Sequence, residues 1–152
     1  MVSAMTDIKR VQAIAEACRR GLKILENRSG SMFFGFPVAS CGPAAEIVGR
    51  ILKEKLNYDG RYVCGDGHPG LEPSQSHAWY EVGNYIVDIT HDQFEGTGLS
   101  GWVFDRAAGW HAQFMNLDHR DGFCMPSGWP CYPFDGYQAA LDEVSKLWCS
   151  YL

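Results

Sequence analysis

The chain of 152 residues lacks any long apolar run, and this absence limits what the protein can be. A helix that crosses a bilayer needs roughly twenty apolar residues in succession, so we expect no membrane span. The opening sequence, MVSAMTDIKR, also lacks the apolar segment of a secretory signal. We therefore expect a cytoplasmic protein whose cysteines are mostly free thiols.

Positive charge is also scarce, because 13 Lys and Arg face 18 Asp and Glu, for a formal net charge of −5. Nucleic-acid-binding modules normally have the opposite balance, so we expect no nucleic-acid partner. No internal repeat or low-complexity segment is present. With 46% hydrophobic residues, the chain can build a core and is not a disordered protein. Its length predicts a single domain over residues 1–152.

Apolar residues three and four apart predict two helices in the first half of the chain. The first spans about 6–26, with Thr6 as its N-cap and Cys18 in its buried stripe. The second begins at Cys41 or one residue after it, because Pro43 suits a first helical turn. The pattern therefore places a cysteine at a helix N-terminus.

The remainder of the chain predicts antiparallel strands and a last helix. The predicted elements are a strand at Arg61–Cys64, a hairpin centred on Gly83-Asn84, weaker strands at Trp102–Phe104 and His111–Met115, and a helix over about 136–150 capped by Asp135. Helices followed by antiparallel strands indicate an α+β domain, whose core we place at 36–115.

The predicted hairpin has two unlike faces. A turn at Gly83-Asn84 puts Val82 opposite Tyr85 and Tyr80 opposite Val87, an apolar face that should lie on the core. The other face carries His77, Trp79 and Glu81 on one strand, and Ile86, Asp88 and Thr90 on the other. We expect that face to point away from the core, so replacing His77 should leave stability nearly intact.

Cys41, His77 and Asp88 have the residue types of a nucleophile, a base and a group that orients the base. A helix N-terminus and a nearby imidazolium both favour a thiolate, and a helix-terminal amide can serve as an oxyanion donor. From the residues alone, a structural cysteine and an unrelated surface His–Asp pair remain open alternatives.

The order Cys-Gly-Pro at a helix start, His-Ala-Trp opening a strand and Val-Asp-Ile-Thr closing the next resembles the transglutaminase-like branch of the papain-like cysteine enzymes. The resemblance covers roughly residues 40–94, with a looser match through Trp110-His111 to Phe114. It implies a papain-like fold in which the helix that carries Cys41 packs on an antiparallel sheet. It also implies that Cys41 is the nucleophile, His77 the general base and Asp88 its orienting partner.

The resemblance implies acyl transfer from an amide through a thioester, without a cofactor or metal. The substrate would be a peptide, a protein side chain or a small amide, and the enzyme a peptidase, amidase or glutamine deamidase. A transamidating acyltransferase and a non-catalytic interaction domain are the alternatives. Papain-type peptidases have a glutamine shortly before the cysteine as an oxyanion donor, but residues 29–40 contain no Gln or Asn, which leaves Gln75 as a remote candidate. No calcium loop is evident, so calcium-dependent crosslinking is not expected.

Other groupings compete with this site. His91 and Asp92 follow the hairpin closely, although the register places Asp88 nearest to His77. Cys64 and His68, joined by His77 or His91, form a weaker zinc candidate, because the paired spacing of structural zinc sites is absent.

Two further expectations concern the second half of the chain. Cys124 and Cys131 could bridge across their loop, although reduced thiols fit a cytoplasmic protein better. The aromatic-rich stretch 95–134 has little regular structure, so we expect part of it, around Trp102–Trp110, to form one wall of the Cys41 cleft.

Overall fold

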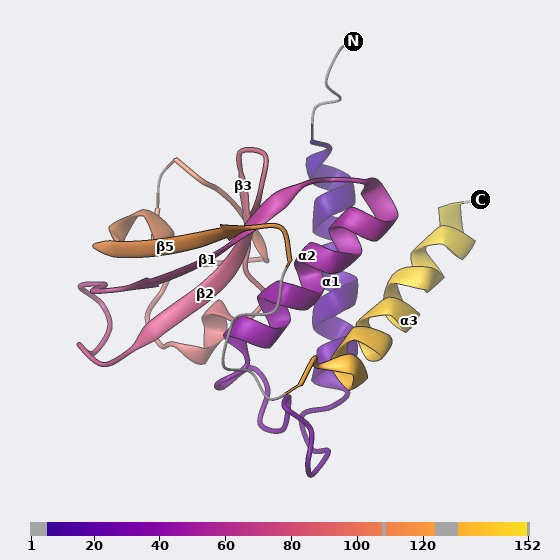
Figure 1. The fold of residues 1–152 in the computed structure, drawn as a ribbon, viewed down its shortest axis with the longest axis horizontal. Helices are drawn as coiled ribbons and strands as arrows, with labels where there is room; N and C mark the ends of the chain where they lie inside the picture. Colours follow the sequence, from indigo (N-terminus) through magenta and orange to yellow (C-terminus); the bar gives the residue numbers. More distant parts are fainter. Residues whose placement is uncertain (1–5, 108, 124–130, 152) are drawn as a thin grey trace.

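A five-stranded antiparallel sheet with three helices beside it makes up the part of the chain that the structure, a computed structural model, describes: residues 6–107, 109–123 and 131–151. The helices are α1 (Ile8–Lys23), α2 (Cys41–Leu56) and α3 (Phe134–Tyr151), and the strands are β1 (Gly60–Asp66), β2 (Ser76–Val82), β3 (Tyr85–Val87), β4 (Val103–Asp105) and β5 (Asn116–Asp121). The strand order is β4-β3-β2-β1-β5. Figure 1 shows the helices gathered beside the sheet, where α2 packs on β1 and β2 and α1 packs against both α2 and α3. The α+β class is confirmed.

Local capping sets the helix ends. Asp7, rather than the predicted Thr6, caps α1, because its carboxylate accepts hydrogen bonds from the amides of Lys9 and Arg10. Helix α3 already begins at Phe134, so Asp135 lies inside the first turn and is not the cap. Its carboxylate accepts from the Ser31 hydroxyl instead.

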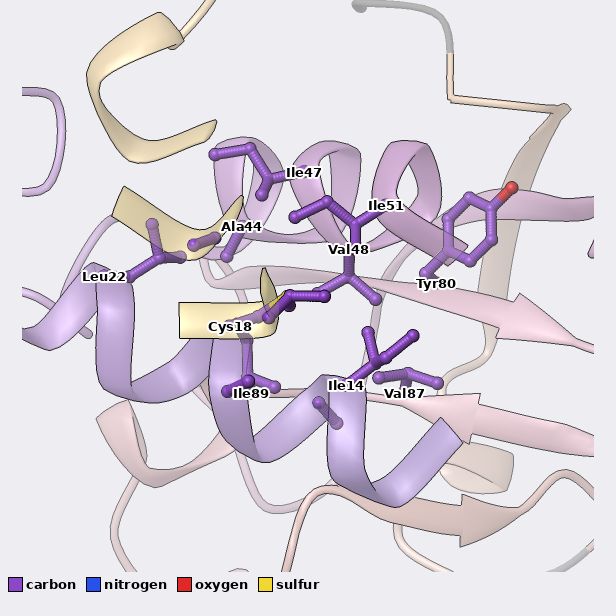
Figure 2. Packing of buried hydrophobic residues seen from close by; sticks show 14 of the residues in the cluster. Ile14, Cys18, Leu22, Ala44, Ile47, Val48, Ile51, Tyr80, Val87 and Ile89 are labelled. Carbon is purple, nitrogen blue, oxygen red and sulfur yellow. The ribbon is translucent and has the colours of Figure 1, made fainter. Parts of the chain in front are cut away.

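The main core lies between α1, α2 and the inner face of the sheet. Figure 2 shows Ile14 and Cys18 of α1 facing Val48 and Ile51 of α2, with side chains of the sheet completing the cluster. Cys18 is fully buried, which confirms it as a core residue. Helix α2 and the sheet approach closely at Gly49. A Cβ added there would lie 2.3 Å from the ring of Tyr80.

The opposite face of the sheet is also buried, which corrects our expectation that it points away from the core. On that face, Val63, Trp79 and Ile86 of the sheet pack against Trp110 and Phe114 in a second cluster. His77 and Asp88 are each only 1% exposed. The prediction that His77 can be replaced without loss of stability is therefore wrong, since its removal would leave the Asp88 carboxylate buried with one donor fewer.

The hairpin register is as predicted, with Tyr80 opposite Val87 and Val82 opposite Tyr85. The predicted strand at His111–Met115 is wrong, because it is a 3₁₀ turn, η2 (His111–Gln113), followed by the unpredicted β5. Strand β5 pairs with β1 at the sheet edge, and all of its residues are exposed. Among the described residues, no helix is long and apolar enough to cross a membrane.

Candidate active site

Cys41 is the first residue of α2. Ser40 precedes it, fully buried, with its hydroxyl donating to the Val38 carbonyl. The first bond of the helix runs from the amide of Ala44 to the carbonyl of Ser40, so the amides of Cys41 and Gly42 lie in the unpaired first turn. The thiol therefore lies at the positive end of the helix dipole, as predicted.

The Cys41 thiol lies within hydrogen-bonding reach of His77. Burial by itself would raise the pKa of the thiol. The hydrogen bond and charge of His77, together with the amide of Ala78, outweigh burial and lower the pKa of Cys41 below its ordinary value. A lowered pKa favours the thiolate, which is the nucleophilic form of cysteine.

Asp88 orients the imidazole of His77. The Nε2–H of His77 donates to Oδ2 of Asp88 at 2.7 Å. Nδ1, which also lies 3.3 Å from the amide nitrogen of Gln93, is therefore the nitrogen that can act on the thiol. Burial would lower the pKa of His77, but the Asp88 carboxylate and the Cys41 sulfur raise it well above its ordinary value. The structure thus brings together all three residues that the sequence predicted.

A fourth residue, His111, belongs to the same cluster and had no predicted role. Its Nε2–H donates to the same Oδ2 of Asp88, also at 2.7 Å. Burial would raise the pKa of Asp88, but His77 and His111 hold it well below its usual range. The sequence offered only the Trp110-His111 pair in an aromatic loop, 23 residues from Asp88, with no local pattern that joins the two.

Aromatic rings enclose the imidazole of His77. The rings of Phe94 and Trp110 meet it edge-on, with centroids 5.1 and 5.8 Å away. Stretch 95–134 therefore reaches the site through Trp110, which contacts His77, and His111, which contacts Asp88. Trp110, at one end of the Trp102–Trp110 segment that we expected to wall the cleft, thus packs on His77. Trp102, at the other end, instead stacks on His91, with the Arg19 guanidinium over its ring.

Asp92 and His91, the competing acid and imidazole, have other partners. Asp92 forms a two-pronged ion pair with Arg19, at 2.8 and 2.9 Å. The Nε2–H of His91 donates to the Gly101 carbonyl at 2.8 Å. Asp88 is thus the partner of His77, as the hairpin register predicted.

The weaker zinc candidate around Cys64 and His68 is not assembled among the described residues. The Nδ1 of His68 accepts from the Gly70 amide, and its Nε2–H donates to the Trp110 carbonyl, so both of its nitrogens are occupied. The cluster of possible metal ligands within the described ranges is His77, Asp88 and His111. Its nitrogen-to-oxygen separations are 2.7 Å, whereas ligands around a tetrahedral zinc lie about 3.3 Å apart. Hydrogen bonds therefore fit this cluster better than a metal ion.

The other residues considered in the sequence analysis are the remaining cysteines and Gln75. The thiols of Cys18, Cys64 and Cys131 are free, and Cys124, the other half of the possible bridge, lies outside the described residues. The side-chain oxygen of exposed Gln75 accepts from the Glu72 amide in its own loop. The glutamine at the site is Gln93, whose amide nitrogen lies 3.3 Å from Nδ1 of His77.

No known protein family, curated protein or solved structure matches the chain.

Proposed function

We propose that the protein is a cysteine-dependent acyl-transfer enzyme that acts on an amide bond through a thioester. The observation that carries the proposal is the Cys41 thiol at the start of α2 within hydrogen-bonding reach of His77, which Asp88 orients. A helix N-terminus, an imidazole and a carboxylate in this order are the parts that activate a thiol as a nucleophile. They support the papain-like, transglutaminase-like reading of the fold.

In the proposed reaction the Cys41 thiol gives its proton to Nδ1 of His77, and the sulfur attacks the carbonyl carbon of an amide. The carbon–sulfur bond forms as the carbonyl electrons move to oxygen, and the amides in the first turn of α2 stabilise that oxyanion. His77 then gives its Nδ1 proton to the leaving amine, the carbon–nitrogen bond breaks, and a thioester remains. Water, deprotonated by Nδ1, attacks the thioester, and the carbon–sulfur bond breaks. The Nδ1 proton returns to the sulfur, so that a carboxylic acid is released and the thiol is restored.

We favour hydrolysis, with a peptide, a protein side chain or a small amide as substrate. In the transamidating alternative, an amine replaces water in the second step. A non-catalytic interaction domain is the other alternative. The arrangement argues against this alternative. Burying a carboxylate with two histidines costs free energy, and a thiol with a lowered pKa beside them is typical of a functional site.

The test is to trap the thioester with an activated ester, p-nitrophenyl acetate. Release of p-nitrophenolate should show a burst, and mass spectrometry should find the acetyl group on Cys41. The Cys41→Ser and His77→Ala variants should lack the burst, while Cys64→Ser, which changes another free thiol, should keep it. Acetyl groups that are absent from Cys41 in the wild-type chain would contradict the proposal. Added hydroxylamine or a primary amine then tells hydrolysis from transfer by the product formed.

A further inference from the structure

Asp88 holds two histidines, and every hydrogen-bonding position of its carboxylate is used. Its Oδ2 accepts from Nε2–H of His77 and from Nε2–H of His111, both at 2.7 Å. Its Oδ1 accepts from the amide of Thr90 at 3.0 Å and from the Thr90 hydroxyl at 3.4 Å. Donors on both oxygens fix the plane of the carboxylate as well as its position.

The cluster is shielded from water. The side chains of His77, Asp88 and His111 are 0, 0 and 2% exposed. A carboxylate that is buried this deeply keeps its charge only through the donors around it, and hydrogen bonds to a charged group are the strong ones. His111 provides one of the two shortest of these bonds.

His111 is itself held in place by rings. The rings of Trp79 and Trp110 meet it edge-on, with centroids 4.9 and 5.0 Å away, and Phe104 lies 5.5 Å away. An imidazole packed in this way has one position for its Nε2–H, and that position is Oδ2 of Asp88.

We propose that His111 is a positioning residue of the candidate active site, acting on His77 through Asp88. Without it, Oδ2 would have one donor and the carboxylate could turn about its Oδ1 contacts. The imidazole of His77 would follow, and its Nδ1 would lose alignment with the Cys41 sulfur. This inference rests on the proposed function, because it concerns the same reaction.

The competing explanation is that His111 only fills the aromatic cluster. His68 offers a matched control, because it is another buried histidine against Trp110, with ring centroids 4.4 Å apart. Its nitrogens bond to backbone groups rather than to Asp88. The changes to compare are His111→Phe, which keeps a flat ring and removes the donor, His111→Gln, which keeps an N–H near the Nε2 position, and His68→Phe.

The measurement is the rate of Cys41 acetylation by p-nitrophenyl acetate, with the melting temperature of each variant recorded alongside. We expect His111→Phe to be slower by roughly 10–100-fold, the effect of losing one hydrogen bond to a charged group. His111→Gln should recover the rate to within about fivefold of wild type, and His68→Phe should stay within about threefold. His111→Asn, whose shorter side chain withdraws the donor, provides a second loss variant if the phenylalanine variant does not fold.

A double-mutant cycle with Asp88→Ala separates positioning from packing. If His111 acts through Asp88, its replacement changes the acetylation rate by less than about threefold once Asp88 is gone. Losses that multiply across the cycle, a His111→Phe rate equal to wild type, or an equal loss in His68→Phe would each overturn the proposal. A wild-type chain that is never acetylated at Cys41 would overturn the proposed function, and the role of His111 with it.

Discussion

Glu46 should make the stability of this protein fall as the pH rises. It follows Cys41 by five residues in α2, is 1% exposed, and neither of its carboxylate oxygens has a hydrogen-bond partner. Burial raises its pKa from the ordinary 4.5 to about 7, although the charge of Arg50 opposes this. We predict that Glu46→Gln stabilises the protein above neutral pH.

The size of the effect follows from proton linkage. Between pH 4.5 and about 7 the unfolded chain loses a proton that native Glu46 keeps, so stability declines over that range and is constant above it. One pH unit between two pKa values corresponds to about 1.4 kcal/mol, so ionised Glu46 costs about 3 kcal/mol at pH 8. The neutral glutamine avoids this cost. For a chain of this size, the melting temperature should rise by roughly 6–12 °C.

Urea unfolding followed by tryptophan fluorescence, at pH 4.5 and pH 8, measures the difference directly. The Glu46→Gln variant should gain about 3 kcal/mol at pH 8 and little at pH 4.5, where the native carboxyl is protonated and the unfolded one is about half protonated. Glu16→Gln on the exposed side of α1 is the control and should change neither value appreciably. A Glu46→Gln variant that is no more stable than wild type at pH 8 would refute the reasoning.

Two other substitutions test the hairpin and the core. Asp88→Asn should lower the rate of Cys41 acetylation by several orders of magnitude, because an amide favours the wrong tautomer of His77. Asp92→Asn, which weakens a partly exposed ion pair with Arg19, should keep the wild-type rate. The reverse result would overturn the pairing of Asp88 with His77. Gly49→Ala should lower the free energy of unfolding by about 1–3 kcal/mol in urea titrations, since its methyl group would overlap the Tyr80 ring, and an unchanged value would show that α2 and the sheet can move apart.

Local patterns in the sequence predict much of the fold and the three-residue site. Apolar periodicity and Pro43 place the start of α2 at Cys41, and the two-residue turn at Gly83-Asn84 sets the register that brings Asp88 beside His77. Both are signals between near neighbours in the chain. Such signals can be recognised in the sequence without knowledge of the long-range contacts.

The features that the sequence did not predict depend on contacts between distant segments. Strand β5 reads NLDHRD and is exposed along its whole length, so it has no apolar alternation, and only its pairing with β1 makes it a strand. The burial of His77 follows from Trp110 and Phe114 packing on its face of the sheet. Trp79 and Ile86 on that face were an available sign that it is covered, because two large apolar residues are out of place on a solvated face.

The central claim is that His77 and the start of α2 make Cys41 a reactive thiolate. The most direct test is the alkylation rate of each cysteine with iodoacetamide between pH 5 and pH 9, resolved by peptide mapping. Cys41 should react first at pH 6, ahead of exposed Cys131, and Cys18 should stay unreactive because burial raises its pKa to about 12. His77→Ala should remove the advantage of Cys41 at pH 6. Alkylation of Cys131 before Cys41 in the wild-type chain, or a Cys41 rate that is unchanged in His77→Ala, would contradict the account.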